Sequence, residues 1–236
     1  AMQDPALANN EAFVVFGHDS ANAEQVSPSN IQQMFSGCTY LTSVDMRVFP
    51  TAPATLYGLF SNCENIKNVS QRAAGSPDIM ATDGSGAYVN AGNVWLPENW
   101  DTSHITTLAY LFQGAKSLET VELYDFSRFG GAPNTGVDMS YMFDGAESMT
   151  TCKLLAKQEV GSAVNMRYMF QNCKSLIELD MTGVGTRGFR EGVATMNSFQ
   201  SYGSANTAMF QMFNGATSLV SPLGASTGAG NPNSYG

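Results

Sequence analysis

Acidic side chains at outward positions of short predicted strands come closest to residues that could do chemistry. They are Asp45, Glu119, Glu122, Glu178 and Asp180. Two carboxylates that flank a glycosidic bond can hydrolyse it, but the spacing of these five acids selects no specific pair. Lys67 and Lys153 have outward positions on the same strands. The pattern therefore predicts an acidic sheet face that is solvated, or that steers a basic partner electrostatically.

The four cysteines occupy positions that predict core packing. Cys38, Cys63 and Cys173 each stand three residues after a repeated phenylalanine, where other copies of the repeat have alanine. Cys152 stands where other copies have valine or leucine. We therefore predict buried free thiols, with a Cys38–Cys63 disulfide between adjacent repeats as the alternative. No two cysteines are close in sequence and the chain has 2 histidines, so we predict no zinc site.

The histidines do not stand in a recognisable catalytic motif. His18 is next to Asp19 and Ser20, and His104 is next to Ser103. A serine nucleophile needs a histidine and an acid that converge in space, and no G-x-S-x-G elbow surrounds any serine. We predict no catalytic residues.

Two loop segments match ligand-binding motifs only in part. Residues 183–188 fit the spacing G-x-G-x-x-G, but no acidic residue lies near position 208 and no long helical pattern follows at once. Asp78 and residues 83–85 lack the alternating ligands and the closing glutamate of an EF-hand. We predict no cofactor and no metal, and leave another kind of calcium site open as the alternative.

The elements that must position these residues follow from a repeat. The pattern Met/Leu-Phe-x-Gly/Asn-Cys/Ala occurs six times, with separations of 25, 52, 31, 27 and 43 residues. Its phenylalanines, called position 0 below, are Phe35, Phe60, Phe112, Phe143, Phe170 and Phe213. A period near 26 with insertions predicts a solenoid. The two longest gaps contain insertions at 73–93 and 183–208, and such loops often lie on the binding face.

Residues around each phenylalanine predict one short helix and one short strand. Position −5 is an N-cap residue type in five of the six copies, and position +2 is always glycine or asparagine, which end helices. Positions −4, −1 and 0 are apolar with helical spacing. Positions +6, +9 and +11 are apolar in four of the six copies, and the last two alternate as in a half-buried strand. The fold class is therefore α/β, with helices of about one and a half turns on one side and a parallel sheet on the other.

One column of aromatic residues is a candidate binding feature. Tyr110, Tyr141 and Tyr168 stand at position −2 of three successive repeats. Such a ladder could stack on sugars or anchor a protein partner. The alternative is that each ring is half-buried along the neighbouring repeat.

The repeat resembles that of the BspA-like leucine-rich-repeat surface proteins, which also occurs in mycoplasma-type lipoproteins. Residues 138–146 (DMSYMFDGA), residues 165–173 (NMRYMFQNC) and the linker at 100–106 (WDTSHIT) carry the resemblance, which covers roughly 30–223. It implies a leucine-rich-repeat-like solenoid with coils of about 25 residues, displayed outside a bacterial cell or on a virion. It also implies attachment to a host-cell or extracellular protein or glycan, without a shared active site.

The composition of the chain narrows the classes of partner and of location that are expected. The chain has 236 residues and a net charge of −9, which disfavours nucleic acid as a partner. Charged residues make up 13% of the chain, about half the usual share, which favours an exported protein. No apolar run is long enough to span a bilayer.

A single repeat domain is expected at 12–223. Residues 12–16 (AFVVF) would form a strand that caps the first repeat. Residues 1–11 would be vector-derived or disordered, and 224–236 a flexible tail rich in glycine, serine and asparagine.

Three functions remain at this point. We expect a non-catalytic, surface-displayed adhesion or recognition module that binds a protein or a glycan. A structural component of a virion or cell-surface fibre, self-associating through an uncapped C-terminal end, is the alternative. A glycan-active enzyme is a more remote one.

Overall fold

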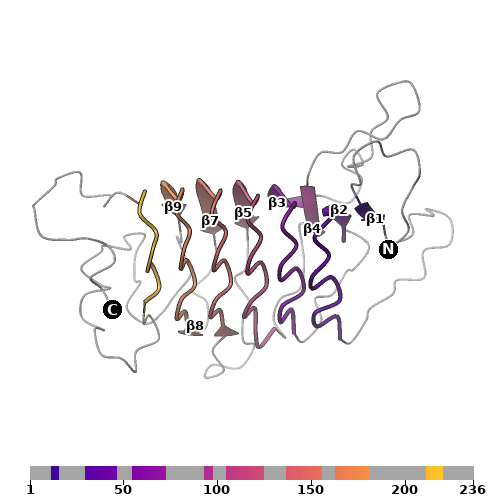
Figure 1. Ribbon diagram of the computed structural model, residues 1–236. Coiled ribbons are helices and arrows are strands. Elements are labelled where there is room, and N and C mark those ends of the chain that lie inside the picture. The colour runs from indigo at the N-terminus through magenta and orange to yellow at the C-terminus, as the bar shows by residue number, and fades with distance from the viewer. Residues whose placement is uncertain are drawn as a thin grey trace, which may run out of the picture.

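The computed structural model describes nine strands and six turn segments and places no helix among the described residues (Figure 1). The described residues are 12–15, 30–46, 55–72, 93–97, 105–124, 137–155, 163–180 and 211–219. The strands are β1 (Ala12–Val15), β2 (Leu41–Asp45), β3 (Asn68–Arg72), β4 (Asn93–Pro97), β5 (Thr120–Tyr124), β6 (Val137–Asp138), β7 (Thr151–Leu155), β8 (Ala163–Asn165) and β9 (Glu178–Asp180). The turn segments, numbered 1 to 6, are 30–38, 55–63, 107–115, 138–146, 165–173 and 211–216.

Seven of the strands form one sheet in the order β1-β2-β4-β3-β5-β7-β9, and every pairing in it is parallel. The predicted parallel sheet is therefore confirmed, as is the strand expected at 12–16, which ends one residue earlier. β4 lies between β2 and β3, although it follows β3 in the chain. Turn 1 bonds directly to turn 2, so no described turn segment lies between them. The sheet, in contrast, has the extra strand β4 between β2 and β3.

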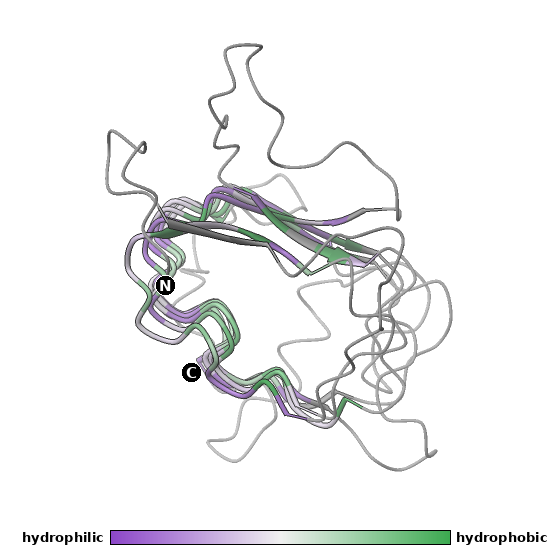
Figure 2. Ribbon diagram, turned by 90° about the vertical axis from the view of Figure 1, so that its right-hand side faces the viewer, coloured by the Kyte–Doolittle hydropathy of each residue, from purple (hydrophilic) through white to green (hydrophobic). Residues whose placement is uncertain are grey.

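The turn segments are where short helices were predicted, and that prediction is wrong. In all six copies the residue at −2 has a positive φ, as does the residue at +2. A positive φ at −2 is incompatible with a continuing right-handed helix. It instead suits the third position of a tight turn. Viewed along the stack, the turns superpose on one another and the strands superpose on one another (Figure 2).

Alternate peptide groups in these turns point in two directions. In turn 3, the N–H groups of Tyr110 and Phe112 donate to carbonyl oxygens of turn 4 at 3.0 and 2.8 Å. The N–H groups of Leu111 and Gln113 donate within turn 3, each to the residue three positions earlier, at 3.2 Å. Every second N–H therefore joins one repeat to the next, so the turns form a bonded stack rather than separate helices.

The residues at −5, predicted as helix caps, make the expected kind of bond in turns. The Oγ1 atom of Thr107 accepts from the N–H of Ala109 at 3.1 Å, and Asp138 Oδ1 accepts from Ser140 N–H at 2.9 Å. The same bond forms in turns 1, 2 and 5. The side chains at −5 accept backbone N–H groups as predicted. Each bond, however, joins residues two positions apart and closes a turn instead of capping a helix.

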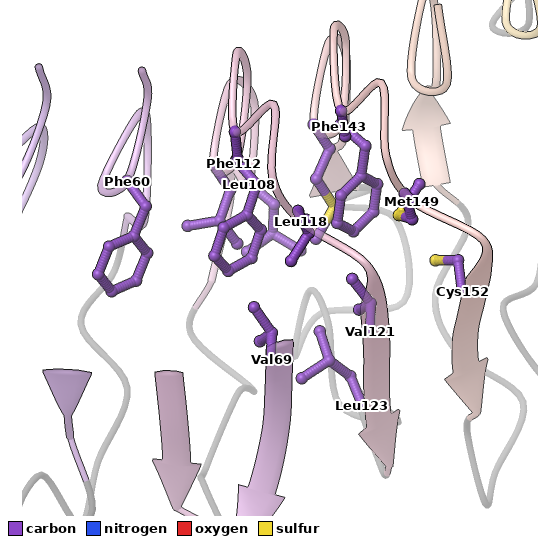
Figure 3. Close-up of a cluster of buried hydrophobic side chains, with 14 of the residues drawn as sticks. Phe60, Val69, Leu108, Phe112, Leu118, Val121, Leu123, Phe143, Met149 and Cys152 are labelled. Carbon is purple, nitrogen blue, oxygen red and sulfur yellow. The ribbon is translucent and has the colours of Figure 1, made fainter. Parts of the chain in front are cut away.

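The core lies between the turns and the sheet, and its centre is a column of stacked phenylalanine rings (Figure 3). Successive rings have centroids 5.4–5.9 Å apart and are within 10° of parallel. This phenylalanine column consists of Phe35, Phe60, Phe112, Phe143, Phe170 and Phe213, each at most 7% exposed. The inward assignment of positions −4, −1 and 0 is confirmed in the described repeats except at Met34, which is 46% exposed.

Close contact with the preceding turn explains two of the glycines at +2, Gly114 and Gly215. A Cβ on Gly215 would lie 2.8 Å from Asn172 Oδ1 of the preceding turn, and one on Gly114 would collide with Asn62 Oδ1. Asparagine tolerates the positive φ, but it needs glycine in the next turn. Each asparagine at +2 is therefore followed by glycine at +2 of the next turn.

Several sequence predictions fall outside the described residues. They concern the ends at 1–11 and 224–236, and most of both insertions, at 73–92 and 183–208. Within the part of the chain that the structure describes, no helix has the length and apolarity that a membrane crossing requires.

Candidate functional site

The three tyrosines singled out from the sequence stand on successive turns at position −2. Their φ angles are 62° at Tyr110, 56° at Tyr141 and 58° at Tyr168. A residue with a side chain is disfavoured there by roughly 1–2 kcal/mol. The surrounding bonds impose the conformation, because the N–H groups of Tyr110 and Tyr141 each donate to the next turn. The backbone therefore fixes where each ring starts.

The rings form a continuous ladder. The centroids of Tyr110 and Tyr141 are 4.9 Å apart with the planes 7° from parallel, and those of Tyr141 and Tyr168 are 4.7 Å apart at 19°. Tyr57 adds a fourth ring, 5.3 Å from Tyr110 and tilted by 59°. The Arg167 guanidinium lies 5.9 Å from the centroid of Tyr168. These four tyrosines, the tyrosine ladder below, are half-buried.

Sequence reasoning missed two members of this surface. Tyr57 stands at −3 rather than −2, because turn 2 has Gly58 at the ladder position. A Cβ on Gly58 would lie 3.1 Å from Cγ of Gln33, which leaves little space for a ring. Arg167 also stands at −3, in a column without a common residue type. A comparison of residues at position −2 alone could not find either residue.

The two inner members of the tyrosine ladder, Tyr110 and Tyr141, are electrically neutral over the physiological range. Burial, followed by the neighbouring Tyr141 and Tyr57, raises the pKa of Tyr110 above its usual value. Burial and the neighbouring Tyr168 likewise raise the pKa of Tyr141. These two phenols therefore stay protonated and can donate hydrogen bonds. Because the rings stack face to face, both faces of Tyr141 contact other tyrosines.

The predicted acidic residues are only partly brought together. Lys153 on β7 lies 3.7 Å from a carboxylate oxygen of Glu122 on β5 and 3.5 Å from one of Glu178 on β9. Asp180 pairs with Lys153 in the sheet register. This part of the sheet therefore carries one lysine among three acids.

The other two acids lie elsewhere. Glu119 is exposed and directly precedes β5. Asp45 lies on β2, separated from β5 by β4 and β3, and is only 7% exposed. Asp45 is therefore buried, and it is not part of a solvated acidic face as the sequence predicted.

A column of alternating charge was not found from the sequence. At position +4, Lys116 lies 2.8 Å from Glu64, and Lys174 lies 3.0 Å from Glu147. The hydrogen bond from Lys116 to Glu64 raises the pKa of that ammonium group. Between 41% and 57% of the surface of each of these four side chains is exposed, so each pair adds little stability. Comparison of position +4 across the repeats was the signal that could have revealed this charge column.

The cysteines behave as core residues. All four are free thiols; Cys63, Cys152 and Cys173 are buried and Cys38 is half-buried. The Sγ of Cys63 donates to the carbonyl oxygen of Phe35 at 3.0 Å. Burial, and then Cys38, raises the pKa of Cys63 to about 12, and burial raises the pKa of Cys152 and Cys173 as well. These three thiols are poor nucleophiles at neutral pH.

Other sequence candidates cannot be placed. His18, His104, Asp78 and the loops at 83–85 and 183–188 lie outside the described residues. Among the residues that are described, no three His, Cys, Asp or Glu side chains form a group that could hold a metal ion.

Comparison with known proteins finds one family. Its description is "Mycoplasma protein of unknown function, DUF285", and its profile matches residues 85–202 and 134–226, which together span more than half of the chain. No curated protein and no solved structure matches the chain. The matched region contains turns 3 to 6 and strands β4 to β9.

Proposed function

The chain belongs to the DUF285 family, and from this premise we propose that it is a non-catalytic recognition module that binds a protein or glycan partner at a surface. The single observation that carries the proposal is the tyrosine ladder, a row of four aromatic rings at 4.7–5.3 Å spacing on consecutive turns. Tyrosine combines a large apolar contact area with a hydrogen-bonding hydroxyl, and it is enriched among residues that dominate binding energy.

We further propose that the repeats form a leucine-rich-repeat-like solenoid of the BspA-like kind. The all-parallel sheet and the repeat-to-repeat bonds of the turns support it, because each described turn bonds to the turns on either side of it in the stack. Such an array holds its surface side chains in place before a partner arrives. Binding then orders few groups, which lowers its entropic cost.

Between the two partner classes, the ring geometry favours a protein. Stacking on a sugar needs a ring face, and the faces of the inner rings contact neighbouring tyrosines. Edges and hydroxyls remain as contact groups, and these suit the mixed polar and apolar surface of a protein. Display outside a cell or on a virion agrees with the 13% share of charged residues.

The test compares two faces of the molecule. We would measure binding of fluorescently labelled protein to bacterial cells, mammalian cells and an immobilised glycan panel. One variant replaces Tyr110, Tyr141 and Tyr168 with asparagine, which tolerates the positive φ as Asn62 and Asn172 already show. A second replaces Glu119, Glu122 and Glu178 with glutamine.

We expect saturable binding to one class of target, reduced at least about tenfold by the tyrosine variant, which corresponds to roughly 1.4 kcal/mol. The glutamine variant should bind within about twofold of the natural chain. Loss with the glutamine variant alone would place the interface on the sheet face instead. No binding by a folded, self-associating sample would favour the assembly role.

A further inference from the structure

The turn stack has an open edge at turn 1. The carbonyl oxygens of Gln32, Met34 and Ser36 have no hydrogen-bond partner among the described residues. All three residues are exposed. They stand at positions −3, −1 and +1, so their carbonyls recur at every second residue and form a row of acceptors.

The other turns show what such a row binds. The carbonyls at −1 and +1 of turns 2 to 6 accept N–H groups from positions 0 and +2 of the preceding turn. In turns 2 to 5, the carbonyl at −3 likewise accepts from position −2 of the preceding turn. For example, the N–H groups of Gln33, Phe35 and Gly37 donate to Tyr57, Leu59 and Ser61 at 3.0, 3.0 and 2.8 Å. The complementary ligand is therefore a backbone that offers N–H groups at alternate residues.

The exposure of a side chain in turn 1 identifies the same open edge. Position −1 is 0–2% exposed in turns 2 to 6, whereas Met34 at this position of turn 1 is 46% exposed. A Cβ on Gly37 would meet no atom within 4 Å, although those on Gly114, Gly145 and Gly215 would each meet the preceding turn. Turn 1 thus has both the acceptors and the apolar residue of a junction, but no described element covers them.

We propose that this edge binds a segment of a partner polypeptide in the same turn conformation, whose alternate N–H groups donate to the carbonyl oxygens of Gln32, Met34 and Ser36 and whose side chains cover Met34. The interaction continues the bonding that already joins the repeats. Polarity excludes the same edge of a second copy, because two rows of acceptors cannot pair. The proposal is independent of the tyrosine ladder, which lies on the outer side of turns 2 to 5.

The test uses the full 236-residue chain and a labelled synthetic peptide that copies residues 107–118 (TLAYLFQGAKSL). This peptide contains Tyr110 and Phe112, whose N–H groups join repeats within the protein. A second peptide carries N-methyl groups on those two amides and cannot donate hydrogen bonds from these two positions. A matched control is methylated at Ala109, whose amide bonds only the Thr107 hydroxyl of its own turn. Binding is measured by fluorescence anisotropy.

Two protein variants locate the site. Met34→Lys places a charge at the centre of the edge, in the way that natural proteins protect open strand edges. Ile177→Lys makes the same kind of change at a residue that is 59% exposed and far from turn 1 in the stack. Tyr141→Asn tests independence from the tyrosine ladder.

We expect saturable binding with a Kd below about 1 mM, at least about tenfold weaker with Met34→Lys and within about twofold with Ile177→Lys. The peptide methylated at Tyr110 and Phe112 should lose binding, the Ala109 control should keep it, and Tyr141→Asn should bind normally. Equal binding by Met34→Lys, or by both methylated peptides, would overturn the proposal. So would a weaker Kd than this limit for the unmodified peptide.

Three further outcomes would also overturn it by assigning the edge to another occupant. Displacement of the peptide by a soluble glycan would make the ligand a sugar. Self-association that Met34→Lys abolishes, measured by sedimentation, would make it a second copy. A fall of several degrees in the Tm of Met34→Lys would show that the chain covers the edge itself.

Discussion

The phenylalanine column and the tyrosine ladder are two aromatic stacks built by the same repeat, only two residues apart. Their spacings are similar, 5.4–5.9 Å inside and 4.7–5.3 Å outside. The inner rings are at most 7% exposed, whereas the outer ones are half-buried. The bonded turns therefore impose the spacing on both columns, and burial decides what each column does.

This difference separates stability from recognition. An inner ring is surrounded on all sides, so its removal leaves a cavity. An outer ring loses two stacking contacts but exposes no core, and its backbone conformation is one that a side chain disfavours. Substitutions in the two columns should differ in size and kind.

The largest effect is expected for Phe143→Ala. Phe143 is 0% exposed and stacks on Phe112 and Phe170 at 5.9 and 5.5 Å. Its loss should lower the free energy of unfolding by roughly 3–5 kcal/mol. Tyr141→Ala, the matched change in the outer column, should cost about 1–2 kcal/mol for its two ring contacts. Chemical denaturation of both variants measures the difference. Equal losses would show that the outer rings carry as much of the fold as the inner ones.

A smaller effect tests the spacing that both columns share. In Gly114→Ala the new Cβ would collide with Asn62 Oδ1 at a φ of +70°, so we expect a loss of about 2 kcal/mol. Gly37→Ala, at +75° but in open space, should lose only about 1 kcal/mol. Thermal unfolding compares the two, and Asn62→Gly should recover part of the Gly114→Ala loss. Identical losses would mean that φ alone, and not contact between turns, sets the need for glycine.

The smallest effect is the response of the buried core thiols and of the tyrosine ladder to alkali. The raised pKa of Cys63 means that the folded state keeps a proton that the unfolded state loses above about pH 9. The resulting stability is fully present below pH 9 and is lost as the pH rises toward 12. Tyr110 and Tyr141, with pKa values raised above 10.0, add a loss that begins about one pH unit higher.

Replacing Cys63 should remove its own share of the earlier loss, to which the buried thiols of Cys152 and Cys173 also contribute because burial raises their pKa as well. Cys63→Ala fits the core because alanine stands at the same position in turns 3, 4 and 6. Between pH 9 and pH 10 the natural chain should lose about 1 kcal/mol more than this variant. Urea denaturation at intervals from pH 7 to pH 11 gives the two curves. Parallel curves over that range would contradict the assigned role of the buried thiol.

The sequence predicted which residues are inside, but it did not predict the shape of the backbone that places them there. Positions −4, −1 and 0 were assigned to a helical stripe, and they are buried as expected at Leu108, Leu111 and Phe112. An i, i+3 spacing also fits consecutive tight turns, in which the residue at −1 bonds to the residue at −4. Apolar spacing therefore could not distinguish a short helix from a pair of turns.

The candidate site was predicted in part for a related reason. Tyr110, Tyr141 and Tyr168 share one position of the repeat, so their alignment was visible in the sequence. Tyr57 and Arg167 joined them only through space, from a position one residue earlier. The burial of Asp45 was also hidden, because β4 pairs with its strand from about 50 residues further along the chain.

The sequence by itself determined the repeat, the apolar positions that face the core and the glycine or asparagine that each turn requires. These are local properties, since side-chain size and allowed φ act within a few residues. Only the tertiary structure decided that alternate N–H groups bond between repeats, that β4 enters the sheet between β2 and β3, and that turn 1 ends with open acceptors. Those features depend on which backbone groups find partners in other repeats, and hydrogen-bond partners distant in the chain leave no spacing in the sequence.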